Sequence, residues 1–312
     1  MKNPWNKKEN HPYYTFSDRM LELYGAKVYK IALNANLTCP NRDGSLDTRG
    51  CVFCSKGGSG EFASDHFLSI YEQIEQGKRL LSKKVEGVKY IAYFQAFTNT
   101  YGDIEYLKKI YFEALSHPDI VGISIATRPD CLGEEVLDLL EAIGERTHLW
   151  IELGLQTIHE KTSAWIRRGY SLPCFEDAIR KLSKMKAEIV VHLILGFPGE
   201  GNKELMDTID YISGIPIHGV KLQLLHILKG TDLSDLYQAE PFPIPTLPEY
   251  ANMIVDCIEK IPSHIVIHRI TGDGPRNLLI APKWSLDKKK VFNTIFHCFK
   301  ERKTYQGKAS PH

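Results

Sequence analysis

The chain has little net charge and lacks any long apolar run. Its 39 Lys and Arg residues oppose 38 Asp and Glu, giving a formal net charge of +1, so the global charge indicates no nucleic-acid partner. No stretch approaches the roughly 18 uninterrupted apolar residues of a membrane-spanning helix, and segment 1–8 lacks the apolar core of a signal peptide. We therefore expect a cytoplasmic protein without a membrane partner.

Length and composition are ordinary for a globular enzyme. The chain has 312 residues, of which 43% are apolar and 25% charged, enough for one large α/β domain or two smaller ones. No low-complexity linker divides it. We expect an aromatic and basic extension over 1–26, a main domain over 27–240, and a C-terminal cap over 241–312.

Cysteines are few and unevenly spread. Three of the seven, Cys39, Cys51 and Cys54, follow the spacing C-x11-C-x2-C, and no fourth Cys or His adjoins them. In a reducing compartment, clustered cysteines indicate metal binding or catalysis before disulfides. A structural zinc site normally needs four protein ligands, whereas three thiolates can hold three irons of a cubane cluster and leave the fourth open. The triplet therefore predicts a reaction centre, with a zinc site as the alternative.

Short apolar, β-branched runs alternate with amphipathic stretches along the chain. Most of these runs are apolar on both faces, which is typical of parallel strands covered by helices. The repeated order of strand and helix predicts right-handed crossovers and an α/β fold, a partial (β/α)6 barrel with a C-terminal α/β cap. The expected strands are 27–33, 90–94, 121–126, 149–153, 189–195, 220–225 and 265–270.

Polar residues collect at the ends of the expected strands. In a parallel barrel the active site lies at the carboxyl ends of the strands, so these residues are expected to converge. Among them, Arg128, Asp130, Gln223 and His226 are candidate catalytic residues. The others are Gln95 and Thr98 after the second strand, Glu152 at the fourth, and Gly196, Phe197 and Pro198 after the fifth.

Purely structural roles remain open for several of these residues. Gly196–Glu200 could be a simple turn, with Gly supplying backbone freedom and Pro a fixed φ. Glu152 is costly to bury alone. It is therefore either an ion-pair partner, for instance of Arg128 or His192, or a ligand for hydroxyls and amines. Arg128 and Asp130 could simply pair with each other around a turn.

Taken together, these motifs resemble the radical S-adenosylmethionine (SAM) enzymes. Most of that superfamily uses C-x3-C-x2-C, whereas the longer gap here resembles the Elongator catalytic-subunit-like branch, and within it the YhcC/YtqA-type (MnmL-like) proteins. The resemblance extends over about 20–300 and implies a TIM-like partial barrel; no acetyltransferase domain is expected to follow. The segments that carry it are 36–41, 94–100, 127–130, 152–156 and 268–274.

The resemblance implies two cofactors, a [4Fe–4S] cluster and S-adenosyl-L-methionine. Cys39, Cys51 and Cys54 would bind three irons, and SAM would chelate the fourth. Many family members carry a Gly-Gly-Glu run that contacts the methionine amine, and Gln95 and Thr98 stand in its place here. The residues implied around SAM are Phe53, Gln95, Thr98, Glu152, Gly196, Phe197 and Pro198.

The resemblance also implies a substrate and an electron source. The related proteins act on tRNA, and the implied step converts 5-carboxymethylaminomethyl-(2-thio)uridine at the wobble position to 5-aminomethyl-(2-thio)uridine. A low-potential donor such as a flavodoxin or ferredoxin would supply the electron. Two alternatives remain: a radical SAM enzyme acting on a small metabolite or a protein, and a non-enzymatic metal- or RNA-binding module.

The C-terminal segment 283–312 has the one clear local charge bias. It carries eight Lys and Arg against two acidic residues, with Trp284, Phe292 and Tyr305 interleaved. Such a segment could meet phosphates through its cations and stack bases on its aromatic rings. The alternative is a solvated helix whose Phe292, Ile295, Phe296 and Phe299 face the core.

Overall fold

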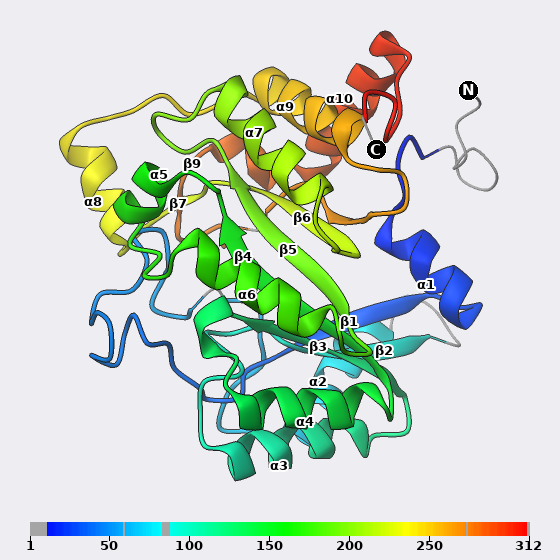
Figure 1. The fold of residues 1–312 in the computed structure, drawn as a ribbon. Coiled ribbons are helices and arrows are strands. Elements are labelled where there is room, and N and C mark those ends of the chain that lie inside the picture. Colours follow the sequence, from blue (N-terminus) through cyan, green and yellow to red (C-terminus); the bar gives the residue numbers. More distant parts are fainter. Residues whose placement is uncertain (1–10, 59, 83–87, 273, 311–312) are drawn as a thin grey trace. The chain divides into compact units, whose positions relative to one another are not determined.

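The computed structural model describes residues 11–58, 60–82, 88–272 and 274–310. The chain divides into two compact units. Figure 1 labels their helices and strands. The cysteine-loop unit comprises Ser17–Gly154 and Arg168–Val190, and the C-terminal unit comprises Leu155–Arg167, Val191–His312 and the described part of Met1–Phe16. The boundaries expected at 26/27 and 240/241 remain predictions.

Seven strands form the main sheet, in the order β1-β2-β3-β4-β5-β6-β8, and β7 and β9 form a second, two-stranded sheet. The pairs β1–β2, β2–β3, β3–β4 and β6–β8 are parallel, as expected for an α/β fold. All seven runs expected as strands are strands of the main sheet. The strands are β1 Val28–Leu33, β2 Lys89–Phe94, β3 Ile120–Thr127, β4 His148–Gln156, β5 Glu188–Leu195, β6 Gly219–Leu224, β7 Ile227–Leu228, β8 Val266–Arg269 and β9 Leu279–Ala281.

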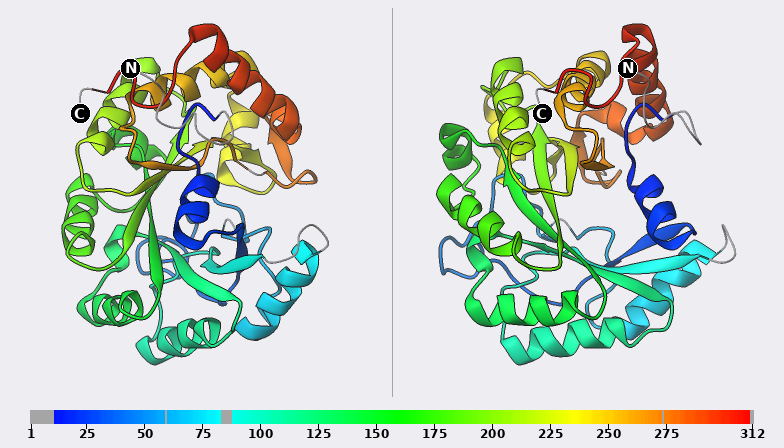
Figure 2. Two further views of the ribbon diagram at one scale, coloured as in Figure 1. Left: turned by 90° about the vertical axis from the view of Figure 1, so that its right-hand side faces the viewer. Right: turned by 45° about the vertical axis from the view of Figure 1, so that its right-hand side comes forward.

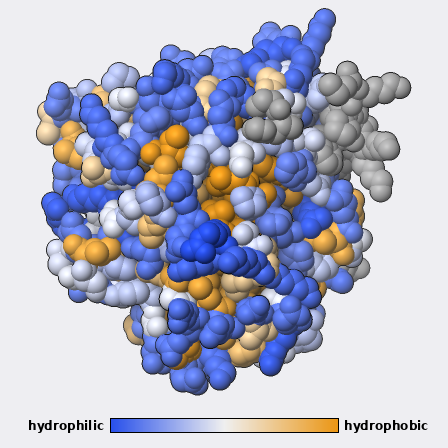
Figure 3. All heavy atoms as spheres, viewed as in Figure 1, coloured by the Kyte–Doolittle hydropathy of each residue, from blue (hydrophilic) through white to orange (hydrophobic). Residues whose placement is uncertain are grey.

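Helices follow most strands, as the alternating pattern predicts. The helices are α1 Phe16–Tyr24, α2 Ile70–Ser82, α3 Ile104–Leu115, α4 Glu134–Gly144, α5 Glu160–Trp165, α6 Leu172–Leu182, α7 Asn202–Ser213, α8 Asp232–Ala239, α9 Leu247–Lys260 and α10 Lys288–Arg302, with 3₁₀ turns η1 Pro129–Cys131 and η2 Lys283–Leu286. Among the described residues, no helix is both long and apolar enough to cross a membrane. In the view of Figure 3, hydrophilic side chains cover most of the visible surface.

In the cysteine-loop unit, helices α2, α3 and α4 cover one face of strands β1–β4 (Figure 2). Phe94 on β2 is fully buried, and its ring meets Tyr111 of α3 edge to face at 5.1 Å. Burying one such aromatic side chain stabilises the fold by about 1.5–3 kcal/mol. On β3, a Cβ at Gly122 would lie 2.7 Å from the Trp150 ring, so the glycine leaves room for a large side chain on β4.

The C-terminal unit contains β6 and β8 and is closed by α9 and α10. Helix α9 begins with the capping box that its sequence indicates, in which Thr246 and Glu249 bond to each other's backbone. Arg302 at the end of α10 forms an ion pair with Asp256 of α9 at 2.7 Å. Val291, Ile295 and Phe299 are buried on the inner side of α10. The core-facing role expected for Ile295 and Phe299 is therefore confirmed, whereas Phe292 and Phe296, expected beside them, are only half-buried.

Candidate functional site

The cysteine loop follows β1, at the carboxyl end of that strand. The backbone N–H of Arg42 donates to the carbonyl of Cys39 at 2.8 Å, and that of Gly50 donates to Asn41 at 2.7 Å. Gly50 has a φ of +79°, a conformation that glycine adopts without strain. A further turn joins the N–H of Cys54 to the carbonyl of Cys51 at 2.9 Å. These bonds fold the long gap back on itself, so that Cys51 returns beside Cys39.

The three thiols influence one another electrostatically. Burial, together with the neighbouring Cys54 and Cys39, raises the pKa of Cys51 to about 12, although Arg128 and Asn41 act to lower it. A buried thiol with a raised pKa holds its proton near neutral pH. It loses that proton when a metal ion coordinates its sulfur. In residues 11–58, 60–82, 88–272 and 274–310, no three Cys, His, Asp or Glu converge on a single ion. A cubane does not require such convergence, because each thiolate binds a different iron. The sulfur donor set therefore fits a [4Fe–4S] cluster.

The segment after β2 packs against the cysteine loop. The backbone N–H of Thr98 donates to the carbonyl of Thr38 at 3.2 Å, directly before Cys39, and Thr98 is 2% exposed. Arg42 donates to the carbonyl of Cys54 at 2.9 Å, and its guanidinium lies 5.8 Å from the Phe97 ring. Thr98 therefore lies beside the cysteine loop as expected, and its contact with a cofactor remains a prediction.

Two further residues of this unit stand at positions implied for SAM binding. Gln95 is half-buried at the end of β2, and its N–H donates to the carbonyl of Leu33 at the end of β1 at 3.3 Å. Phe53 is half-buried within the loop, directly before Cys54. Gln95 thus lies at a strand end where the site was expected, and Phe53 lies within the cysteine loop. The roles of both residues remain predictions.

Glu152 is completely buried on β4 and forms an ion pair with a partner that the sequence did not indicate. Its carboxylate lies 2.5 Å from the ammonium of Lys30 on β1 and accepts a hydrogen bond from Ser124 on β3 at 2.7 Å. The ammonium of Lys30 also lies 4.9 Å from the ring centroid of Tyr93 on β2. Lys30 is the only charged residue of β1, and this isolated charge in an apolar strand could have indicated a buried ion-pair partner. Of the two alternatives left open for Glu152, the structure shows an ion pair, with Lys30 in place of the suggested Arg128. A role for Glu152 as a ligand remains a prediction.

Arg128 and Asp130 form the mutual pair that the sequence left open. Nε and Nη2 of Arg128 donate to the two carboxylate oxygens of Asp130 at 2.9 and 2.7 Å. The same guanidinium approaches Cys39, with 3.9 Å between Nη1 and Sγ. Arg128 is therefore both a turn residue and a neighbour of the cysteine triplet.

In the C-terminal unit, Gly196, Phe197 and Pro198 form a turn after β5. Gly196 has a φ of +88°, and Phe197 is 2% exposed. The N–H of Glu200 donates to the carbonyl of Phe197 at 3.2 Å, and Thr157 donates to the Glu200 carboxylate at 2.8 Å. These contacts show the simple turn that the sequence left open, and a contact of this turn with SAM remains a prediction.

The other two candidate catalytic residues also belong to the C-terminal unit. Nε2 of Gln223 lies 3.4 Å from Nδ1 of His192. Nε2 of His226 lies 3.1 Å from the hydroxyl of Ser285, and burial lowers the pKa of His226 to about 4. His226 is therefore neutral near pH 7. The catalytic roles expected for Gln223 and His226 remain predictions.

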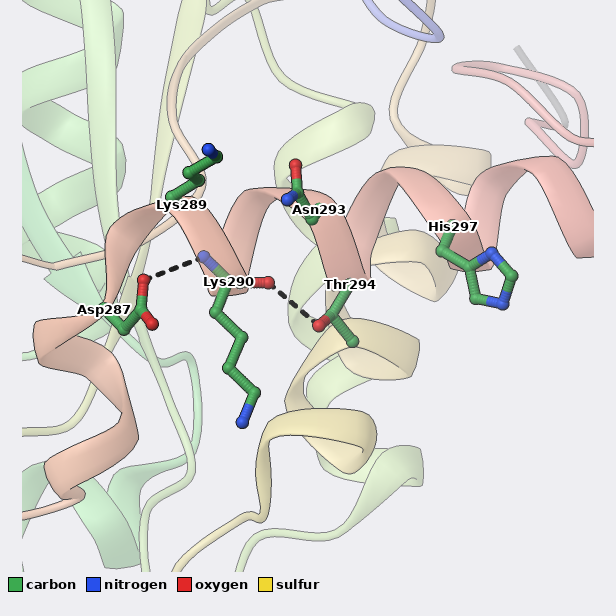
Figure 4. A pocket seen from close by; sticks show the side chains of 6 residues that line it. All are labelled: Asp287, Lys289, Lys290, Asn293, Thr294 and His297. Carbon is green, nitrogen blue, oxygen red and sulfur yellow. Dashed lines mark hydrogen bonds between the residues drawn. The ribbon is translucent and has the colours of Figure 1, made fainter.

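A shallow hollow of about 550 Å³ lies along the outer side of α10 (Figure 4). Asp287 caps the helix by accepting from the N–H of Lys290 at 3.0 Å, and the side chains of Lys289 and Lys290 extend away from the helix. The hollow is lined by Asp287, Lys289, Lys290, Asn293, Thr294 and His297.

Comparison with known proteins identifies the class. Residues 48–212 match the radical SAM superfamily, and residues 217–301 match the radical SAM C-terminal domain. The chain is 41% identical to YtqA of Bacillus subtilis (strain 168), covering 98% of this chain and 94% of the relative. It is 35% identical to YhcC of Escherichia coli (strain K12), covering 86% of each. The chain therefore belongs to the radical SAM superfamily, whose members use a [4Fe–4S] cluster and SAM, as its motifs predicted.

More distant similarities include one protein that is named for tRNA and one solved structure. A tRNA uridine(34) acetyltransferase of Methanocaldococcus jannaschii is 26% identical over 51% of this chain and 30% of its own length. The solved structure of Elp3 from Methanocaldococcus infernus superimposes with a TM-score of 0.67 at 17% identity, covering 90% of this chain and 64% of that one. At this identity the structural match shows the fold alone, and it confirms the expected partial barrel.

Proposed function

We propose that this chain is a radical SAM enzyme that modifies tRNA at the wobble uridine, converting 5-carboxymethylaminomethyl-(2-thio)uridine to 5-aminomethyl-(2-thio)uridine. The observation that carries the enzymatic part is the grouping of Cys39, Cys51 and Cys54 at the carboxyl end of β1, in a member of this superfamily. These three cysteines bind three irons of the cluster, and SAM occupies the fourth. A flavodoxin or ferredoxin in the cytoplasm supplies the electron.

When bound, the cluster and SAM supply a carbon-centred radical that removes a hydrogen atom from an unactivated carbon. The chain's own residues bind and orient the cofactor and exclude water from it. The pairing with Lys30 fixes the Glu152 carboxylate in position within an apolar strand. The residues assigned to SAM are Phe53, Gln95, Thr98, Glu152, Gly196, Phe197 and Pro198.

Two observations support tRNA as the substrate. A relative that matches half of the chain is named as a tRNA uridine(34) acetyltransferase. In addition, α10 buries its apolar side and leaves Lys289, Lys290 and His297 exposed along one hollow. Such cations meet phosphates, whose contacts make RNA binding salt-dependent.

The decisive experiment is mass spectrometry of tRNA nucleosides from a strain that lacks this protein. We expect 5-carboxymethylaminomethyl-(2-thio)uridine to accumulate and the 5-aminomethyl form to disappear. Complementation with the wild type restores the profile, and Cys51→Ala does not. Cys174→Ala, a half-buried cysteine of α6 outside the triplet, serves as the matched control and restores it. An unchanged profile in the deletion strain would reject this substrate.

A further inference from the structure

The guanidinium of Arg128 faces two acceptors, the carboxylate of Asp130 and the sulfur of Cys39. Along one edge, Nε and Nη2 bind the Asp130 carboxylate, and on the opposite edge Nη1 points to Sγ of Cys39 at 3.9 Å. The Arg128 side chain is only 9% exposed. The ion pair is therefore largely withdrawn from water, with its positive end toward the sulfur and its negative end away from it.

A single carbonyl positions the N–H donors of two cysteine sulfurs. The backbone oxygen of Arg168 accepts from Nη1 of Arg128 at 3.0 Å and from Nδ2 of Asn41 at 3.2 Å. The same Nδ2 lies 3.5 Å from Sγ of Cys51. Arg128 and Asn41 thus present one donor to Cys39 and one to Cys51 from a common anchor.

Gly169 makes this close arrangement possible. Its φ is +83°, and a Cβ there would lie 2.7 Å from Oδ1 of Asn41 and 3.3 Å from Nη2 of Arg128. Tyr170 then covers the guanidinium of Arg128, with 4.9 Å to the ring centroid, and donates to the carbonyl of Gly154 at 2.6 Å. Arg128 is therefore held between the ring, the carbonyl and the carboxylate, and its charge is fixed beside the sulfur.

We propose that Arg128 and Asp130 set the reduction potential of the cluster, with Arg128 as a positioning residue for its electrostatics. This inference rests on the proposed function in one respect, that Cys39, Cys51 and Cys54 hold the cluster. Reduction transfers one electron from the donor to the cluster and adds one negative charge. A fixed guanidinium beside the sulfur stabilises that charge, as does an N–H donor to the sulfur, so both raise the potential. The Asp130 carboxylate partly offsets the effect.

The test is a redox titration of the reconstituted protein, followed by electron paramagnetic resonance and without turnover. Arg128→Gln is expected to shift the midpoint to a more negative value, because the positive charge is lost. Asp130→Asn is expected to shift it to a more positive value, because the opposing charge is lost. The double variant returns toward the wild type, and Arg128→Lys, which keeps the charge, shifts less than Arg128→Gln.

Controls separate this electrostatic role from a structural one. Arg180→Gln removes the corresponding charge from the exposed Arg180–Asp177 pair on α6, where solvent screens it, and is expected to leave the midpoint unchanged. Iron content is compared before each titration. Equal midpoints in the variants and the wild type at equal iron content, or shifts of the same sign in both single variants, would overturn the proposal. If Arg128→Gln does not fold, the sign of the Asp130→Asn shift decides. Absence of any cluster in the wild type would instead reject the proposed function.

Discussion

The ammonium of Lys30 on β1 lies 2.5 Å from the carboxylate of Glu152 on β4. The two residues are far apart in sequence, and the hydroxyl of Ser124 on β3 joins them through hydrogen bonds at 3.1 and 2.7 Å. The Glu152 side chain is fully buried, and that of Lys30 is 16% exposed. The ion pair and the Ser124 hydroxyl therefore link strands β1, β3 and β4 through their side chains.

Lys30→Met is predicted to destabilise the protein strongly. It leaves the buried Glu152 carboxylate without its cation, and breaking a buried pair in this way typically costs about 3–5 kcal/mol. Denaturant unfolding measures the change. The double variant Lys30→Met/Glu152→Gln removes both charges and should recover part of the loss. If the single variant unfolds at the wild-type denaturant concentration, the pair is not important for stability.

The stability of the cysteine-loop unit is predicted to fall in acid through Glu188. Burial raises the pKa of this carboxyl, but His148 and Arg19 outweigh that effect and lower it from 4.5 to about 2. Because the folded state holds the proton less tightly than the unfolded state, the stabilisation is complete above about pH 4.5 and is lost as pH falls toward about 2. Trp150 donates to the same carboxylate at 2.8 Å.

Unfolding free energies measured between pH 6 and 2 test this prediction for Glu188, because this range runs from above its ordinary pKa of 4.5 down to its shifted pKa of about 2. The wild type should lose stability more steeply than Glu188→Gln, which cannot titrate at this position. Parallel curves for the two proteins would show that Glu188 does not contribute to the acid sensitivity.

Cys51→Ala is predicted to abolish assembly of an intact [4Fe–4S] cluster, because one iron loses its only protein ligand. Anaerobic reconstitution followed by iron and sulfide analysis and visible absorption gives the readout. Cys174→Ala should retain wild-type iron content, since that cysteine lies on α6 outside the triplet. Stoichiometric zinc without sulfide in the wild type would favour the structural zinc alternative.

Lys289→Glu/Lys290→Glu is predicted to weaken binding of bulk tRNA. For every phosphate that the variant no longer neutralises, the slope of log K against log salt should become shallower by about 0.7–0.9. Filter binding at graded salt measures both quantities, with Lys184→Glu, an exposed lysine in the other unit, as the control. Unchanged affinity and slope in the double variant would exclude α10 as a tRNA-binding element while leaving the cluster chemistry untouched.

The sequence alone predicted the features that depend on local pattern. The strands are recognisable because both of their faces are apolar, and α9 because the Thr246–Glu249 capping box and an early proline mark its start. The Cys39–Cys54 spacing indicated an iron–sulfur centre because thiolate number and spacing limit which metals can be held. These signals need no knowledge of distant contacts.

Only the tertiary structure decided which side chains meet. Lys30 with Glu152, Asn41 with the Arg168 carbonyl, and Arg128 with Cys39 each join segments separated by 89 to 127 residues. Such pairs depend on strand order and on which face each residue occupies, and no local pattern encodes either. The sequence therefore predicted a cluster-binding loop, whereas the packing of Arg128 and Asn41 at the turn of Gly169 determined which side chains lie beside its cysteines.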